Sequence, residues 1–184
     1  MSKLSGYGTP HSLINFYIGN QPSFDGFVAP STLRGMQAGE ITHIVANTSN
    51  HWRKAFNVYA KFMWAFICQA QPALLQACNH VGISTWQEYR DKKLFNDNSY
   101  ESLLFSPLDR STTAPSNVSI LAGKTYGLTQ VSQDLIEVNA QFWIHPHNRI
   151  IIAPYPDYRQ LTNERIMFLC SLVIPLVSGT TLIE

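Results

Sequence analysis

The sequence predicts a single α/β domain over residues 1–184, built as a three-layer sandwich with a mainly parallel central sheet. Several short segments are continuously apolar, which is typical of strands covered on both faces in a parallel sheet. Other segments repeat apolar residues every three or four positions and therefore predict helices between these strands. A length of 184 residues matches one domain of ordinary size.

The composition excludes a disordered chain and a coiled coil, because 45% of the residues are apolar and only 14% are charged. The formal net charge is +1, so the chain lacks the excess of basic side chains that proteins binding the phosphate backbone usually carry. Binding of nucleic acid or a nucleotide would therefore depend on a local site.

The cysteines favour a reducing compartment. Cys68, Cys78 and Cys170 are odd in number and form no C-x-x-C pair, so neither a disulfide framework nor a zinc site is expected. Cys68 and Cys170 lie in apolar runs, which predicts buried thiols. The first residues lack the apolar segment of a signal peptide, and no apolar run is long enough to span a membrane. We therefore expect a cytoplasmic protein with no membrane association, no metal and no cofactor.

The first half of the chain predicts one strand and three helices. Residues 13–19 (LINFYIG) are short, apolar and rich in β-branched and aromatic side chains, as in a strand. Residues 21–39 hold three glycines and two prolines and predict a long loop, a feature that is often functional. Residues 52–67 repeat apolar side chains at helical spacing, after N-cap candidates at residues 48–50.

Two shorter helices should follow. One runs over residues 72–80 and stops at Gly82, a residue typical of helix C-termini. The next begins after Thr85, where Glu88 three residues later completes a capping box, and extends to about Leu94.

The second half of the chain is rich in strands. The predicted strands are residues 102–108, 118–122, 142–144 and 149–153, with loops at residues 109–117 and 123–127. A final helix is expected from Thr162 or Asn163 to about Pro175. His145 and His147 resemble a metal-binding pair, but no third ligand has a matching spacing, so a turn before Arg149 is the favoured interpretation.

The position of the site follows from this strand assignment. Ligands of open parallel sheets bind beyond the carboxyl ends of the strands, so the loops that follow the strands should meet at one edge. Four sequence segments carry these loops: FYIGNQPSF, SLLFSPL, SILAGKTYG and IIIAPYPDYR. The candidate catalytic residues in them are Gln21, Tyr155 and Asp157, and the candidate ligand-binding residues are Asn20, Phe24, Phe27, Lys124 and Arg159.

The order and content of these four segments resemble the uracil-DNA glycosylase superfamily, across most of the chain. In that family the first strand runs into a GQDPY-type loop, and the last strand ends in an HPSP-type loop before the final helix. The resemblance implies the same fold and a site that accepts a flipped base, against which Phe24 or Phe27 would stack. The alternative for both rings is that they cap the apolar edge of the core.

The sequence departs from the family at its catalytic positions. The resemblance places Gln21 where the family has a carboxylate or amide that positions the attacking water. It places Tyr155 where the family has the histidine that stabilises the departing base, and Asp157 stands where serine is usual. Glutamine is a poor general base, whereas a tyrosine hydroxyl can still donate a hydrogen bond to an oxyanion. Standard glycosylase activity is therefore not expected.

Three functions remain open from the sequence. In the first, the chain is a glycosylase-like domain that binds a nucleobase, a nucleotide or nucleic acid. In the second, it is an enzyme that acts on a small molecule at the same edge of the sheet. In the third, it is a non-catalytic interaction module that forms a homo-oligomer. The segment around Tyr155, Asp157 and Arg159 has a structural alternative as well. In it, an ion pair of Asp157 with Arg159, or of Arg159 with Glu164, fastens the loop to the last helix.

Overall fold

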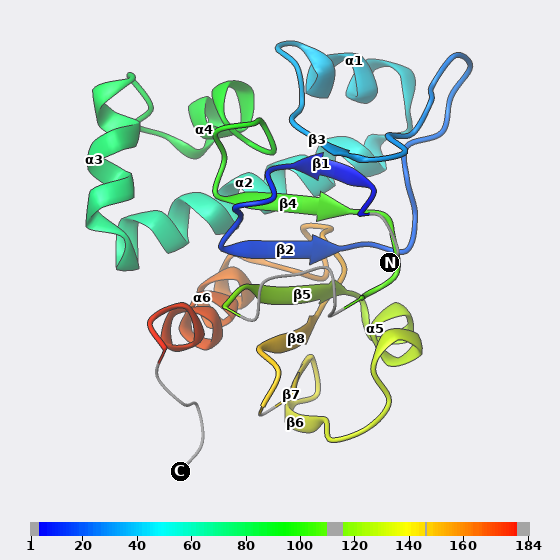
Figure 1. Ribbon diagram of the computed structural model, residues 1–184, viewed down its shortest axis with the longest axis vertical. Coiled ribbons are helices and arrows are strands. Elements are labelled where there is room, and N and C mark those ends of the chain that lie inside the picture. Colours follow the sequence, from blue (N-terminus) through cyan, green and yellow to red (C-terminus); the bar gives the residue numbers. More distant parts are fainter. Residues whose placement is uncertain (1–3, 110–115, 146, 180–184) are drawn as a thin grey trace.

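The computed structural model describes residues 4–109, 116–145 and 147–179 of the chain (Figure 1). Within these residues one eight-stranded sheet is surrounded by six helices, which confirms the predicted α/β class. The strands are β1 (Gly6–Gly8), β2 (Ile14–Tyr17), β3 (Leu33–Arg34), β4 (Glu101–Leu104), β5 (Val118–Ala122), β6 (Ile136–Asn139), β7 (Phe142–His145) and β8 (Ile150–Ala153). The helices are α1 (Glu40–Asn47), α2 (Asn50–Ala70), α3 (Pro72–His80), α4 (Trp86–Lys92), α5 (Lys124–Gln130) and α6 (Asn163–Val177).

The sheet is mixed, with four parallel strands at its centre and a further parallel pair, β1 and β3, at one edge. The strand order is β3-β1-β4-β2-β5-β8-β7-β6. Strands β4, β2, β5 and β8 are parallel to their neighbours within this group, and Figure 1 shows the arrowheads of β2, β4 and β5 pointing the same way. Outside the group, β1 runs antiparallel to β4, and β7 runs antiparallel to both β6 and β8.

Strand β1 was not predicted, because two of its three residues are glycines. Gly6 and Gly8 have φ angles of 148° and 126°, which side-chain-bearing residues rarely adopt. A Cβ atom on Gly6 would lie 2.1 Å from the carbonyl oxygen of Leu103 on β4. These glycines therefore let β1 approach β4 closely. Because they have no apolar side chains, β1 lacks the pattern by which strands are recognised in a sequence.

The two faces of the sheet are covered unequally. Phe16, Ile120 and Ile151 face the main core, which also contains buried side chains of α1, α2, α3, α4 and α6. Their neighbours Tyr17 and Leu121 face a smaller core, which α5 and irregular segments cover. Because successive residues are buried on opposite faces, the central strands are apolar throughout, as the sequence indicated.

Helix α2 supplies the largest share of the main core. All the apolar residues that predicted it are buried, including Trp52, Phe62 and Ile67. The ring of Phe16 on β2 packs against Tyr59 at a centroid distance of 4.5 Å and against Phe62 at 5.6 Å. The prediction that this stripe of α2 belongs to the core is therefore confirmed.

The predicted helix ends agree well with the structure. Gly82 follows α3 with a φ angle of 71°. The capping box before α4 is formed, since the Glu88 N–H donates to Thr85 Oγ1 at 3.2 Å and the Thr85 N–H donates to Glu88 Oε2 at 3.1 Å. Helix α6 begins after Thr162, as predicted, and includes Pro175 in its last turn.

Helices α1 and α5 were missed, and residues 123–127 were wrongly predicted to form a loop. Helix α5 begins immediately after Gly123, at the carboxyl end of β5. Its sequence lacks an apolar stripe, because it touches the sheet through Gly127, where a Cβ atom would lie 2.7 Å from the Ile152 side chain. Helix α1 buries only Ile44, which is too little for a periodic signal. The predicted loop at residues 109–117 falls mostly outside the described residues.

Two further expectations concern the surface. Cys78 and Cys170 are buried, but Cys68 is exposed on α2, so the prediction of a buried thiol was wrong at that position. The apolar run around Cys68 did not indicate burial of the thiol, because part of the run lies on the outer side of the helix. Among the described residues, no helix is both long and apolar enough to cross a membrane.

Candidate functional site

The carboxyl ends of the central strands bring three polar side chains into direct contact. Asn20 follows β2, Tyr155 follows β8, and His51 lies in the first turn of α2. The Tyr155 hydroxyl donates to Asn20 Oδ1 at 2.8 Å and lies 2.5 Å from His51 Nε2. The Asn20 Nδ2 atom lies 3.2 Å from the same histidine nitrogen. We refer to Asn20, His51 and Tyr155 as the strand-end site.

The rings of His51 and Tyr155 also support each other. They are stacked, with a centroid distance of 5.1 Å and an interplanar angle of 28°. Gly123, the last residue before α5, lies beside the Tyr155 ring, where an added Cβ atom would lie 3.6 Å from Tyr155 Cδ2. Both side chains are half-buried, whereas Asn20 is exposed. The site therefore reaches solvent through the amide of Asn20.

The hydrogen-bond inventory of the strand-end site leaves the Asn20 amide incompletely used. A tyrosine hydroxyl has one hydrogen to donate, and a neutral imidazole has one N–H. If His51 carries its hydrogen on Nε2, it can donate to the Tyr155 oxygen, and both N–H groups of Asn20 stay free of it. If the hydrogen is on Nδ1, Nε2 can accept one N–H of Asn20, and in both tautomers the Asn20 carbonyl uses one lone pair towards Tyr155. At least one N–H and one carbonyl lone pair of Asn20 then remain free for a ligand.

A buried tyrosine below the strand-end site has an unused hydroxyl. Tyr59 of α2 is only 3% exposed, and its hydroxyl has no hydrogen-bond partner among the described residues. Burial raises its pKa well above the usual value, and electrostatic interactions with Tyr155 and Tyr126 raise it further. Leaving such a buried group unpaired costs about 1–3 kcal/mol.

Burial also sets the charge of the strand-end site. Burial lowers the pKa of His51 and outweighs the attraction of the imidazolium to Asp157, while Lys54 lowers the pKa further. Burial raises the pKa of Tyr155 to about 12, despite the opposing hydrogen bond to Asn20. At neutral pH, the site therefore presents a neutral imidazole, a protonated phenol and a neutral amide.

Asp157 has a structural partner. Its carboxylate accepts from the backbone N–H of Arg159 at 2.9 Å and pairs with Lys54 of α2 at 3.1 Å. These interactions, with the Arg159 N–H first, lower the pKa of Asp157. The expected ion pairs of Arg159 with Asp157 or Glu164 are not found among the described residues, and Lys54 is the partner of Asp157 instead. Asp157 therefore fastens the loop after β8 to α2.

The other predicted site residues are spread more widely. Gln21 is exposed next to Asn20, and Arg159 is exposed with its guanidinium 5.7 Å from the Tyr158 ring. Lys124 lies over the Trp143 ring at 4.4 Å, on the smaller core's side of the sheet. Phe24 and Phe27 pack on each other at 5.1 Å and rest against the main core, and Phe24 also contacts His43.

His51, Lys54 and Tyr59 were not identified as site residues from the sequence. All three belong to α2, whose regular apolar pattern identifies a helix but does not single out individual polar atoms. Tyr126 of α5 packs against Gly19, the residue before Asn20, where a Cβ atom would lie 2.8 Å from the Tyr126 ring. The one available signal was the position of His51 in the first turn of a helix that begins near a strand end.

The turn predicted before Arg149 is confirmed, since His145 ends β7 and His147 and Asn148 lie in the turn that follows. The ring of His145 lies 2.8 Å from Asn148 Nδ2 and accepts from the His147 N–H at 3.3 Å. Among the described residues, no group of three or more histidine, cysteine or acidic side chains is arranged to hold a metal ion.

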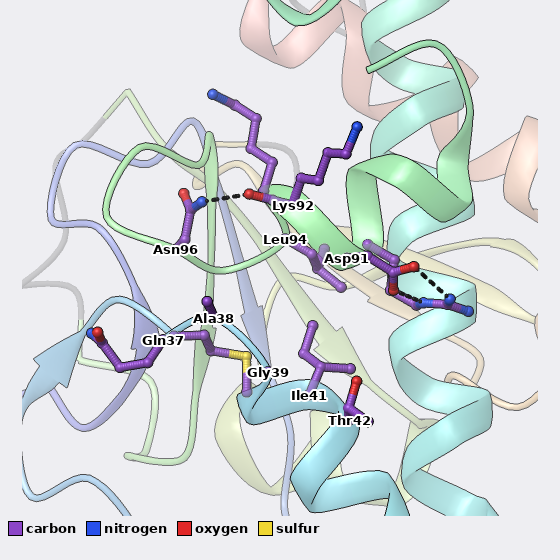
Figure 2. A pocket seen from close by; sticks show the side chains of 12 residues that line it. Gln37, Ala38, Gly39, Ile41, Thr42, Asp91, Lys92, Leu94 and Asn96 are labelled. Atoms are coloured by element: carbon purple, nitrogen blue, oxygen red, sulfur yellow. Dashed lines mark hydrogen bonds and ion pairs between the residues drawn. The ribbon is translucent and has the colours of Figure 1, made fainter. Parts of the chain in front are cut away.

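A separate cavity of about 350 Å³ lies between the start of α1 and the end of α4 (Figure 2). Several of its polar groups already have partners within the protein. Asn96 Nδ2 donates to the Lys92 carbonyl at 2.9 Å, and Arg90 pairs with Asp91 at 2.7 Å. The strand-end site has more unused hydrogen-bonding capacity and is therefore the stronger candidate.

The electrostatics of the strand-end site lead to a first prediction. Replacing Asp157 with asparagine should lower the pKa of His51 further, because the carboxylate stabilises the imidazolium and screens it from Lys54. A pH titration of the His51 ring signals by NMR measures this shift. Glu164→Gln on α6 is the control and should leave the His51 pKa unchanged. An unchanged pKa in Asp157→Asn would refute the electrostatic contact.

Comparison with known proteins gives one match. A model described as a family of unknown function (DUF6942) matches residues 5–174. No curated protein and no solved structure matches the chain.

Proposed function

The chain belongs to DUF6942, a family of unknown function, and we propose that its strand-end site binds a nucleobase or nucleotide without excising a base from DNA. The observation that carries this proposal is the exposed Asn20 amide, held by Tyr155 and His51 with a donor and an acceptor free. Amide side chains pair with the donor and acceptor groups of base edges.

The position of the site supports the same class of ligand. Nucleotides commonly bind beyond the carboxyl ends of parallel strands, where Asn20 and Tyr155 lie. The resemblance of the four strand-end segments to uracil-DNA glycosylases supports a base-binding site at this edge. A free nucleotide is favoured over a long nucleic acid, because the net charge of +1 provides little attraction to a phosphate backbone.

Excision of a base is not part of the proposal, because the site lacks an available carboxylate. Asp157 is paired with Lys54, and Gln21 has an amide that cannot accept a proton at neutral pH. The neutral ring of His51 contacts Tyr155 through Nε2. The donors at the site are therefore suited to holding a base, and we expect no release of uracil from a uracil-containing oligonucleotide.

Calorimetric titration with uridine 5′-monophosphate tests the proposal, with ribose 5-phosphate as the ligand that lacks a base. We expect saturable binding of the nucleotide, and binding at least tenfold weaker for the sugar phosphate. Tyr155→Phe should weaken nucleotide binding about tenfold, because one hydrogen bond that orients Asn20 is lost. Equal binding of both ligands, or no binding of either, would reject a base-binding site.

Tyr59→Phe tests whether the buried hydroxyl is unpaired. Because the hydroxyl has no partner among the described residues, its removal should leave the free energy of unfolding unchanged or raise it by about 1 kcal/mol. Tyr89→Phe is the contrast and should lower the free energy of unfolding, because the Tyr89 hydroxyl donates to Glu101 at 2.6 Å. Urea denaturation measures both changes, and an equal loss in Tyr59→Phe would mean that its hydroxyl has a partner.

A further inference from the structure

A second binding site is formed where α2, α4 and α6 meet on the outer side of the main core. An open groove of about 480 Å³ lies there, which is the size of ordinary small-molecule sites. Its lining is mostly apolar and is shared by the three helices. The residues are Lys61, Trp64, Ala65, Cys68 and Gln69 of α2, Trp86 of α4, and Asn163, Ile166 and Met167 of α6.

The apolar part of the groove is accessible to solvent. Met167 is 50% exposed, and the exposed Cys68 lies on the same strip of α2 as Trp64. The Met167 sulfur contacts the Gln69 amide at 3.8 Å, and flexible methionine side chains adapt readily to apolar ligands. The groove thus offers two indole rings and a thioether to an apolar body.

One end of the groove carries a positive charge without an acidic partner. The Lys61 ammonium donates to the Asn163 side-chain carbonyl at 3.3 Å and lies 5.2 Å from the centre of the Trp86 ring. Among the described residues, it forms no ion pair with a carboxylate. An anionic group at this position would gain a charge-assisted hydrogen bond with Lys61.

The surface beyond Lys61 extends this positive character. A smaller hollow of about 240 Å³ shares Lys61 and Trp86 with the groove and is lined by Arg53, Lys54 and Tyr158. Lys54 is neutralised by Asp157, but Arg53 forms no ion pair among the described residues. The charged end of a ligand would therefore meet cations at Lys61 and beyond, while its apolar end meets Trp64 and Met167.

From this arrangement we propose that the groove binds a small amphipathic carboxylate, with its apolar chain along Trp64 and Met167 and its carboxylate at Lys61. The ligand class follows from two features of the groove: its lining is mostly apolar, and the cation at its end forms no ion pair among the described residues. Binding is independent of the strand-end site, because neither side chain of the Lys61–Trp86 pair belongs to it.

Three probes of equal chain length test the proposal: decanoate, 1-decanol and decyltrimethylammonium, each kept below the concentration at which it aggregates. Calorimetry should show one decanoate bound per chain, with the alcohol at least tenfold weaker and the cation weaker still. In NMR spectra, the indole N–H signals of Trp64 and Trp86 should shift on binding, while those of Trp52 and Trp143 stay in place. Equal affinities for the three probes, or shifts at Trp52 and Trp143 instead, would overturn the proposal.

Two variants separate the charged end from the apolar trough. Lys61→Gln should reduce decanoate affinity to that of the alcohol without changing alcohol binding, whereas Lys92→Gln on α4, outside the groove, should change neither. Met167→Glu should weaken both ligands. Circular dichroism checks that each variant is folded.

A second copy of the chain is the competing occupant of the groove. Sedimentation of the wild-type protein and of Met167→Glu decides between the two. A monomer in both cases supports the small ligand. A wild-type dimer that Met167→Glu dissociates, together with no decanoate binding, would show that another copy covers the groove.

Discussion

Replacing Glu101 with alanine should destabilise the protein by about 3–5 kcal/mol, because two buried donors and one half-buried donor would lose their acceptor. The Glu101 side chain is fully buried at the start of β4. It accepts from the Tyr89 hydroxyl at 2.6 Å, the Phe95 N–H at 3.0 Å and the Tyr100 N–H at 3.2 Å. Urea denaturation measures the loss, and Glu137→Ala on the exposed β6 should cost only a few tenths of a kcal/mol.

The same residue should make stability depend on pH. Burial raises the pKa of Glu101 from 4.5 to about 7, although its hydrogen bonds, led by that from Tyr89, oppose the shift. The folded protein then holds a proton that the unfolded chain has already lost between these values. The free energy of unfolding should fall as the pH rises from about 4.5 through 7, by a contribution on the order of 3 kcal/mol.

Glu101→Gln isolates that contribution, because glutamine does not titrate. The difference in unfolding free energy between wild type and Glu101→Gln should favour the wild type more at pH 5 than at pH 8. A difference that is constant across this range would mean that Glu101 keeps an ordinary pKa in the folded protein.

Phe62→Ala should cost about 3–5 kcal/mol, because it removes a large ring from the centre of the main core. Phe62 is 1% exposed, and its ring contacts Phe16 at 5.6 Å and Phe66 at 6.4 Å. Thermal and urea denaturation should both show the loss. The half-buried Phe27 provides the control, since Phe27→Ala should cost clearly less. A transition that barely moves in Phe62→Ala would contradict the placement of this face of α2 in the core.

The sequence predicted best the elements whose burial is regular. The stripe from Trp52 to Ile67 and the apolar strand β8 repeat the same environment over several residues, so their patterns identify them. The capping box at Thr85 was predictable because its two hydrogen bonds are local. Elements that rely on one close contact, such as Gly6 against β4 and Gly127 against Ile152, leave no periodic signal.

The candidate site was only partly predictable for a related reason. The strand-end rule located Asn20 and Tyr155 at one edge, and their hydrogen bond joins them there. It could not identify His51 or Lys54, because these residues come from α2 and reach the edge through the packing of that helix on the sheet. Tyr59 has no distinguishing pattern at all, since its hydroxyl lies on the buried side of the same helix.

The most direct test of the account is an NMR titration that follows the ring signals of His51 while uridine 5′-monophosphate is added. If the base binds to the Asn20 amide, the hydrogen bonds of His51 Nε2 change. We predict a saturable shift of the His51 signals with the affinity measured by calorimetry, and unchanged signals from the distant His80 on α3. Nucleotide binding that leaves His51 unchanged, or the absence of binding, would contradict the central claim that the strand-end site binds a base.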